Sequence, residues 1–266
     1  MRMCPLYSGS SGNSIYVGTE NTHLLVDVGK PGKYMDSALN GLDLSGNDID
    51  GILITHEHSD HIQGLGVFSR KYHVPIYATE ATIEKIKTFT SLGKIDPELY
   101  HCISADEEFS LGDICVNPMH ISHDAADPVA YRFRSGEKKV AVCTDLGCYT
   151  DYTVDCLQGL DALLLEANHD VKLLEANKIY PYPLKRRILG EFGHLSNETS
   201  GKLLSSVLHD NIKKIFLGHL SRENNYPDLA FEAVRCEISL ADNPYKPSDF
   251  DIIVAKRDVP SECIEV

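Results

Sequence analysis

The sequence predicts an α/β fold in which two mixed β-sheets form a sandwich flanked by helices. Short strand-like segments crowd the first half of the chain, and strands alternate with helices in the second half. The chain has 266 residues, of which 42% are hydrophobic, so it contains enough apolar material for a sizeable core. Because no long Gly/Ser-rich or Pro-rich linker interrupts it, we expect a single domain over residues 1–266.

Strand signals dominate the first half. We expect a hairpin of Ser14–Gly18 and His23–Gly29, and a strand buried on both faces at the apolar run Asp50–Thr55. Helical periodicity predicts helices over Ile62–Tyr72 and Ala81–Phe89. Four further short strands are expected at Tyr100–Ile103, Asp113–His120, Val129–Arg134 and Lys139–Thr144.

Strands and helices alternate in the second half. Apolar runs predict strands at Ala162–Glu166, Lys214–Gly218 and Asp251–Ala255. Helices are expected at Ser196–His209 and Asp228–Leu240. Their order places helices against the sheets, as a layered sandwich requires.

The composition restricts the partners and the location of the protein. A net charge of −14 argues against a non-specific nucleic-acid binder, so attraction of a polyanion requires a local basic patch. No stretch reaches the roughly 18 uncharged apolar residues of a membrane span, and the N-terminus lacks the apolar run of a signal peptide. We therefore expect a soluble cytoplasmic protein without a membrane partner, and the sequence leaves its oligomeric state open.

The segment Thr55–His61, THEHSDH, concentrates potential metal ligands directly after a predicted buried strand. Side chains alternate in an extended segment, so His56 and His58 point the same way and can share one ion. Asp60 and His61 lie beyond the bend and can reach a second ion. Imidazole and carboxylate groups suit zinc, manganese and iron. A solvated surface loop is the alternative, but three histidines in six residues are rare in such a loop.

HEHSDH resembles the HxHxDH signature of the metallo-β-lactamase superfamily. The resemblance implies two divalent metal ions, zinc or manganese with iron also possible, and a fold of the αββα sandwich type. The implied ligands are His56, His58 and His123 for one ion, Asp60, His61 and His219 for the other, and Asp145 as a bridge. Asp27 matches the early aspartate of the family and is expected to support the ligand loop from behind.

Two later segments resemble the RNase Z branch of that superfamily. LEAN at Leu165–Asn168 resembles its HEAT segment, with Glu166 at the glutamate, and GHLSN at Gly193–Asn197 resembles its additional histidine motif. The resemblance implies that Glu166 orients His194, which protonates the departing alkoxide of a phosphodiester. No long basic insertion is present that would serve as an arm for transfer RNA, so tRNA maturation is not expected.

Over almost the whole chain the sequence is similar to the bacterial YycJ/WalJ family. The matching segments include Ser8–Ser14, Ser122–Pro128, Leu165–Asp170 and Pro183–Gly190. The resemblance implies a metal-dependent phosphodiesterase or nuclease, specifically a 5′-to-3′ DNA exonuclease that uses a dinuclear metal-bound hydroxide. DNA is then the expected partner, and the expected catalytic residues are Asp60, His194 and Glu166.

Two further segments are candidates for substrate contact. Ser10 and Asn13 belong to the loop SGSSGNS, whose backbone N–H groups can approach a phosphate, although a plain polar turn explains it equally well. Lys185, Arg186 and Arg187 form the only three-residue basic run, which suits a DNA backbone or a solvated helix face. His120, His169 and Asp170 receive no role.

Other activities remain open at this point. A small-molecule phosphodiesterase, for instance on cyclic nucleotides, would use every residue named above, and the acidic charge favours it over long DNA. A glyoxalase-like thioester hydrolase keeps HxHxDH but needs no second His-Leu-Ser motif paired with Glu166. A non-catalytic module is disfavoured by the complete set of seven ligands.

Overall fold

The computed structural model describes all 266 residues, which form two compact units. The first unit contains Met1–His120, Ala125–Lys138 and Lys256–Val266. The second unit contains Ile121–Asp124 and Lys139–Ala255. The single domain expected over residues 1–266 stays a prediction.

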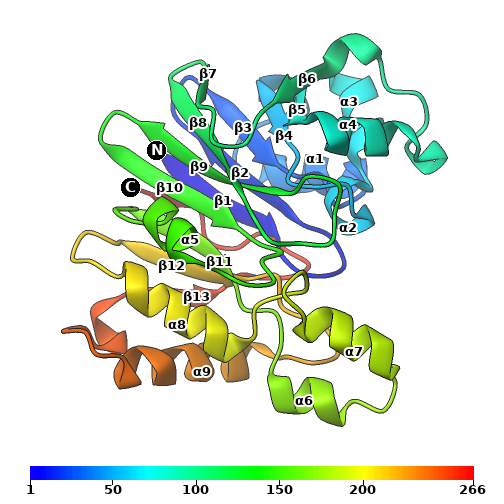
Figure 1. The fold of residues 1–266 in the computed structure, drawn as a ribbon. Helices are drawn as coiled ribbons and strands as arrows, with labels where there is room; N and C mark the ends of the chain where they lie inside the picture. Colours follow the sequence, from blue (N-terminus) through cyan, green and yellow to red (C-terminus); the bar gives the residue numbers. More distant parts are fainter. The chain divides into compact units, whose positions relative to one another are not determined.

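A seven-stranded sheet lies within the first unit, in the order β14-β1-β2-β3-β4-β5-β6 (Figure 1). The strands from β14 to β3 pair antiparallel and those from β3 to β6 pair parallel, so the sheet is mixed. Its strands are β1 (Arg2–Tyr7), β2 (Ser14–Gly18), β3 (His23–Val26), β4 (Gly51–Leu53), β5 (Ile76–Thr79), β6 (Tyr100–Ile103) and β14 (Ile264–Glu265).

A second seven-stranded sheet has the order β13-β12-β11-β10-β9-β8-β7. Pairing is antiparallel from β7 to β9 and parallel from β10 to β13, so this sheet is mixed as well. Its strands are β7 (Phe109–Leu111), β8 (Ile114–His120), β9 (Val129–Ser135), β10 (Lys138–Cys143), β11 (Ala162–Glu166), β12 (Lys214–Gly218) and β13 (Ile252–Val254). The expectation of two mixed sheets flanked by helices is confirmed.

Nine α-helices accompany the strands (Figure 1). In the second unit α8 and α9 run side by side, and α9 also contacts β13. The helices are α1 (Gly32–Asn40), α2 (Ser59–Ile62), α3 (Leu65–Tyr72), α4 (Glu80–Lys87), α5 (Asp151–Cys156), α6 (Val171–Ala176), α7 (Tyr182–Leu189), α8 (Asn197–Val207) and α9 (Pro227–Leu240). Four single 3-10 turns are η1 (Gly46–Asp48), η2 (Thr90–Leu92), η3 (Pro97–Leu99) and η4 (Pro247–Asp249).

Several elements differ from the expectation. The helix predicted over Ile62–Tyr72 is divided between α2 and α3, because Gly64 passes directly against the backbone of Lys30, where a β-carbon would lie 2.0 Å from the carbonyl oxygen. The strand predicted to reach Gly29 ends at Val26, because Asp27 turns into the left-handed region with a φ of 63°. The sequence patterns also missed β1, β5, β7, β14, α1, α5, α6 and α7.

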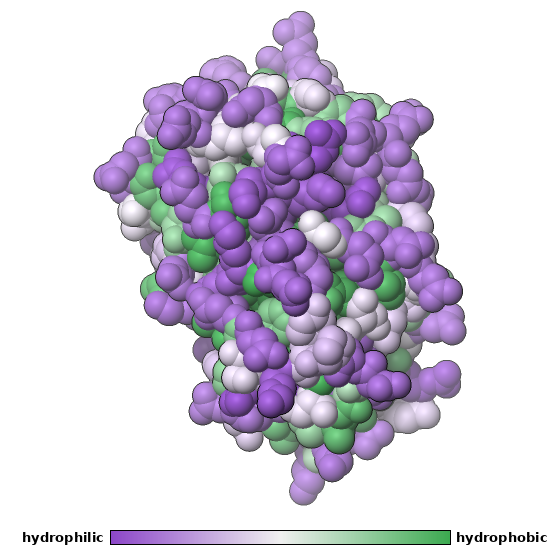
Figure 2. Space-filling view, turned by 90° about the vertical axis from the view of Figure 1, so that its left-hand side faces the viewer, coloured by the Kyte–Doolittle hydropathy of each residue, from purple (hydrophilic) through white to green (hydrophobic).

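Burial follows the strand pairing. Every residue of β11 and of β12 is buried, as expected for parallel strands inside a sheet. In the first unit, the core includes the fully buried side chains of Tyr16, Met35 and Phe68. Each fully buried side chain of this size stabilises the fold by about 1.5–3 kcal/mol. The face of the molecule shown in Figure 2 is mainly hydrophilic, with apolar residues in separate patches. None of the helices is long and apolar enough to cross a bilayer.

Candidate metal centre

Four ligand-type side chains gather just beyond the end of β4 in the first unit. His56 and His61 are fully buried, whereas His58 and Asp60 are half-buried. His56 Nε2 lies 3.1 Å from His58 Nδ1, and His61 Nε2 lies 3.5 Å from Asp60 Oδ2. The structure thus brings together the four residues of the HxHxDH motif, which we call the first cluster.

Asp27 lies behind the first cluster, at the end of β3, which pairs in parallel with β4. Its buried carboxylate accepts hydrogen bonds from the Thr55 N–H and hydroxyl, both at 2.8 Å, and from His61 Nδ1 at 2.7 Å. Burial raises the pKa of Asp27, and the contacts with His61 and Thr55 oppose that rise. When the carboxylate is ionised, His61 Nδ1 must carry the hydrogen, which leaves the Nε2 lone pair as the one able to bind a metal.

The glycine-rich loop of the first unit supports the same ligands. The backbone N–H of Asn13 donates to the Asp60 carbonyl at 2.7 Å. The side-chain Nδ2 of Asn13 lies 3.3 Å from Asp60 Oδ2 and 3.1 Å from His61 Nε2. Gly29 passes so close that a β-carbon there would lie 1.8 Å from the Asp60 carbonyl oxygen. Asn13 is buried, and Ser10 is exposed with its hydroxyl 3.5 Å from Arg257. Their contact with substrate stays a prediction.

A second cluster forms in the second unit at the carboxyl ends of β10, β11 and β12. Cys143 pairs with Leu165 and Glu166 pairs with Gly218, so this register places Asp145, Glu166 and His219 at one edge of the sheet. Asp145 and His219 have positive φ angles of 61° and 54°, unusual for non-glycine residues and frequent where a site constrains the backbone. The ligand atoms of Asp145, Glu166, His194 and His219 all lie within 4.8 Å of one another.

Glu166 is fully buried and holds two histidines at once. Its Oε1 accepts from Nδ1 of His194 and from Nδ1 of His219, each at 2.8 Å, and its Oε2 accepts from the backbone N–H groups of Leu146 and Leu195. Burial raises the pKa of Glu166, but His194 and His219 outweigh burial and lower it to about 2. Burial in turn lowers the pKa of His194, and Glu166 more than offsets this, so that pKa is raised. The sequence pattern connected Glu166 with His194 alone.

His123 belongs to the short segment of the second unit that follows β8. Its Nδ1 donates to the Gly193 carbonyl at 3.1 Å. Its Nε2 then faces two carboxylates, with Asp124 Oδ1 at 3.6 Å and Asp145 Oδ1 at 3.8 Å. The His123 and His194 rings are 5.1 Å apart, so His123 lies beside the second cluster.

The chemistry of these side chains fits divalent metal ions. In three of the predicted metal ligands, His61, His123 and His219, Nδ1 donates to a carboxylate or carbonyl oxygen, which leaves Nε2 as the coordinating atom. Imidazole nitrogens and carboxylate oxygens are the donors preferred by zinc, manganese and iron. The residues present therefore suit the metals that the sequence motif implies.

The basic run of α7 is only partly available to a ligand. Arg187 pairs with Asp124, next to His123, and Lys185 Nζ donates to the Glu175 carbonyl at 2.6 Å. Arg186 is exposed and makes no ion pair. Of the three predicted substrate contacts on α7, Arg186 is the one best placed to meet an anion.

Sequence reasoning missed other polar residues. Lys30 Nζ lies 3.3 Å from the Ser11 hydroxyl, and Arg257 approaches Ser10, so two cations from distant parts of the chain flank the glycine-rich loop. No local pattern connects either residue with that loop. His169 is almost fully buried, neither ring nitrogen has a partner, and burial lowers its pKa to about 4.

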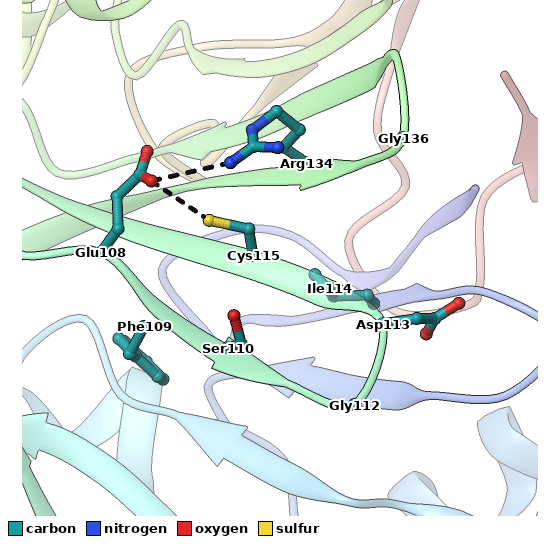
Figure 3. A pocket seen from close by; sticks show the side chains of 9 residues that line it. All are labelled: Glu108, Phe109, Ser110, Gly112, Asp113, Ile114, Cys115, Arg134 and Gly136. Atoms are coloured by element: carbon teal, nitrogen blue, oxygen red, sulfur yellow. Dashed lines mark hydrogen bonds and ion pairs between the residues drawn. The ribbon is translucent and has the colours of Figure 1, made fainter.

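A surface pocket of about 420 Å³ lies elsewhere in the first unit, along β7 and the neighbouring strands β8 and β9 (Figure 3). Glu108 points toward Arg134 at 3.7 Å and toward the Cys115 thiol at 3.4 Å. No predicted site residue lines this pocket. Glu108 and Arg134 pair with each other, and the remaining charged side chain of the lining, Asp113, accepts a hydrogen bond from the Thr19 hydroxyl at 2.7 Å.

Comparison with known proteins assigns the class. The Beta-lactamase superfamily domain matches residues 34–208, more than half of the chain. Zn²⁺-bound PqqB from Methylobacterium extorquens shares the fold with a TM-score of 0.72 at 15% identity, over 98% of this chain and 100% of that one. The short form of human tRNase Z shares it with a TM-score of 0.66 at 15% identity over both full chains. The chain belongs to the β-lactamase superfamily and has the metallo-β-lactamase fold, as the motif implied.

Closer relatives narrow the family. Exodeoxyribonuclease WalJ of Streptococcus pneumoniae is 42% identical over 237 residues, which is 89% of this chain and 88% of that protein. Exodeoxyribonuclease YycJ of Bacillus anthracis is 42% identical over 225 residues, which is 85% of this chain and 84% of that protein. The chain belongs to the WalJ/YycJ family, and the resemblance seen in the sequence is confirmed.

Proposed function

We propose that the chain is a metal-dependent exodeoxyribonuclease that removes nucleotides from the 5′ end of DNA. The observation that carries the proposal is the 42% identity to two exodeoxyribonucleases over most of the chain. The two clusters supply the chemistry that such an activity requires, because each combines imidazole with carboxylate. A cytoplasmic location follows from a DNA substrate and belongs to the same proposal.

The metal ligands belong to the same proposal. We assign His56, His58 and His123 to one ion, Asp60, His61 and His219 to the other, and Asp145 to both. When bound, two such ions supply Lewis acidity toward the phosphate and activate a water molecule as nucleophile. Asp27 contributes by fixing the ring orientation of His61.

His194 is the proposed general acid. Its Nδ1 is held by Glu166 at 2.8 Å, its side chain is 21% exposed, and its pKa is raised. A raised pKa favours the protonated imidazole, and partial exposure allows contact with a substrate. The protonated ring can then donate from Nε2 to the departing sugar oxygen, which is a poor leaving group without a proton. Glu166 keeps the ring oriented while the proton leaves.

The decisive experiment uses DNA labelled at either end. With Mn²⁺ or Zn²⁺ present, single- and double-stranded substrates labelled at the 5′ end should release a labelled mononucleotide from the start, and chelation should stop the reaction. His58→Ala should remove the activity, whereas His101→Ala, which changes an exposed histidine on β6, should retain it. Release of the label first from 3′-labelled DNA would contradict the proposed polarity.

A small phosphodiester is the second candidate substrate, because the net charge of −14 opposes the approach of long DNA. The same preparation should be tested on a cyclic nucleotide and on an acylglutathione thioester. A higher kcat/KM on the cyclic nucleotide than on DNA would favour the small substrate. Activity on the thioester alone would identify the protein as a thioester hydrolase and contradict phosphodiester cleavage.

A further inference from the structure

The segment of residues 171–192, which contains α6 and α7, exposes an unusual concentration of apolar side chains. Residues 171–192 hold five of the twelve large apolar side chains that the whole chain exposes. Ile179 is 79% exposed, Tyr182 72% and Phe192 60%. Exposed apolar surface is a common feature of interaction sites, so this concentration makes residues 171–192 a candidate binding surface. We call this the α6–α7 surface; its apolar members are Leu173, Ile179, Tyr182, Leu189 and Phe192.

The α6–α7 surface is basic in a strongly acidic protein. Residues 171–192 contain five Lys or Arg and two Glu, a net charge of +3, whereas the chain carries −14. Lys172, Lys178 and Arg186 are exposed. The complementary ligand is therefore an anion with accessible apolar faces. Single-stranded DNA has this combination, because its phosphates are charged and its unpaired bases expose flat rings.

The surface is tied directly to the proposed general acid. The Ile188 carbonyl near the end of α7 accepts the His194 N–H at 3.0 Å, and the Asp124 N–H donates to the Phe192 carbonyl at 3.1 Å. Gly193 passes so close to α7 that a β-carbon there would lie 2.1 Å from the Ile188 oxygen. Phe192 is thus held two residues from His194, at the end of the surface nearest the second cluster.

We propose that the α6–α7 surface binds single-stranded DNA by base stacking, with Phe192 taking the base nearest the cleaved bond and Tyr182 a base further along the strand. The proposal rests on the proposed function and deepens it. The eight residues of α7 span about 12 Å, so Tyr182 and Phe192 flank a short stretch of nucleotides. Arg186, exposed on the same helix, meets the phosphates between them.

The expected effect is measurable. Stacking of one base on an aromatic ring contributes about 1–3 kcal/mol, which corresponds to a factor of about 5–150 in affinity. Phe192→Leu keeps the apolar bulk but removes the ring, so kcat/KM on single-stranded DNA should fall within that range. Phe192→Trp should restore it. Methyl p-nitrophenyl phosphate has no bases, so its hydrolysis should be the same in all variants.

The test follows stacking directly with a decamer of single-stranded DNA that carries 2-aminopurine at its 5′ nucleotide. In the metal-loaded protein, His194→Ala slows turnover enough to measure binding, and the fluorescence should be quenched when the DNA binds. Adding Phe192→Leu to this variant should remove the quenching and raise Kd. Phe89→Leu, which changes a 36% exposed phenylalanine in the first unit, is the matched control and should behave as its parent.

Unchanged quenching and DNA kinetics in Phe192→Leu would overturn the proposal and assign the surface to another occupant, such as a protein or an anionic membrane. Equal losses on DNA and on methyl p-nitrophenyl phosphate would overturn it as well, because the ring would then support the fold. If the wild-type protein cleaves no DNA, the proposed function fails. If it cleaves DNA and Phe192→Leu cleaves it equally well, only the stacking proposal fails.

Discussion

Replacement of Glu166 by Gln tests the second cluster most sharply. Glu166 accepts four N–H groups, two on each carboxylate oxygen. Glutamine offers one acceptor oxygen and one NH2 donor, so it can serve only one of these pairs. If the oxygen stays with the Leu146 and Leu195 backbone, the NH2 group faces the histidines. Each imidazole must then accept at Nδ1, which moves its hydrogen to Nε2.

The magnitude follows from that change of tautomer. A histidine protonated at Nε2 does not bind metal through that atom, and loss of an outer-sphere partner typically lowers metal affinity by about 10–100-fold. If the side chain adopts the opposite orientation, two buried N–H groups lose their acceptor at about 1–3 kcal/mol each. Glu166→Gln is thus expected to weaken metal binding through His219 or to destabilise the fold.

The assay combines three measurements on Glu166→Gln: metal content after dialysis, kcat on DNA and on methyl p-nitrophenyl phosphate, and Tm. We expect reduced metal content or a lower Tm, with losses on both substrates. Full metal content, wild-type Tm and a loss confined to DNA would refute the reasoning. Glu166 would then act through His194 alone, and its contact with His219 would be without consequence.

Three further results are expected. His194→Ala should lose about 10²–10⁴-fold in kcat on DNA with unchanged metal content and should recover most of its rate on methyl p-nitrophenyl phosphate; a lost ion would make His194 a ligand. Arg186→Ala should reduce the slope of log Kd for DNA against log salt concentration by about 0.7. Replacement of the exposed Lys94 by Ala is the control and should leave the slope unchanged. Equal slopes in both variants would mean that α7 is a solvated helix face that does not contact DNA. The third result concerns the pKa of His169, which is 6.5 in an exposed histidine and about 4 in the folded chain. As the pH falls, the unfolded chain therefore takes up a proton before the buried imidazole does. The free energy of unfolding should therefore fall by about 2 kcal/mol between pH 7.5 and 5. Denaturant unfolding in the presence of a chelator should show a smaller fall for His169→Asn than for the unaltered protein. An equal fall in both proteins would contradict this role of His169.

The parts of the site that depend on local sequence could be predicted from the sequence alone. HEHSDH follows a short apolar strand, and alternation alone brings His56 and His58 together. Strand ends also located Asp145, Glu166 and His219, because a buried apolar run followed by a polar residue is visible without a structure. The two mixed sheets followed from the number and order of such runs.

The remainder depends on contacts between distant segments. The second partner of Glu166 follows from the register of β11 with β12, which pairs Glu166 with Gly218, and no local pattern encodes that register. β1 contains Pro5 and an irregularity near Tyr7, which weaken its strand signal. α6 and α7 are short and rich in exposed residues, so their apolar side chains do not follow the period of a helix packed on a core.

The most direct test of the account is the number of divalent ions bound by each chain. The seven assigned ligands exceed what one tetrahedral ion requires, and two ions acting together are the basis of the proposed phosphodiester cleavage. Elemental analysis of the protein, purified and dialysed in metal-replete buffer, should give about two ions per chain and about one in His219→Ala. One ion per chain in the unaltered protein, or activity on DNA that survives complete removal of metal, would contradict the account.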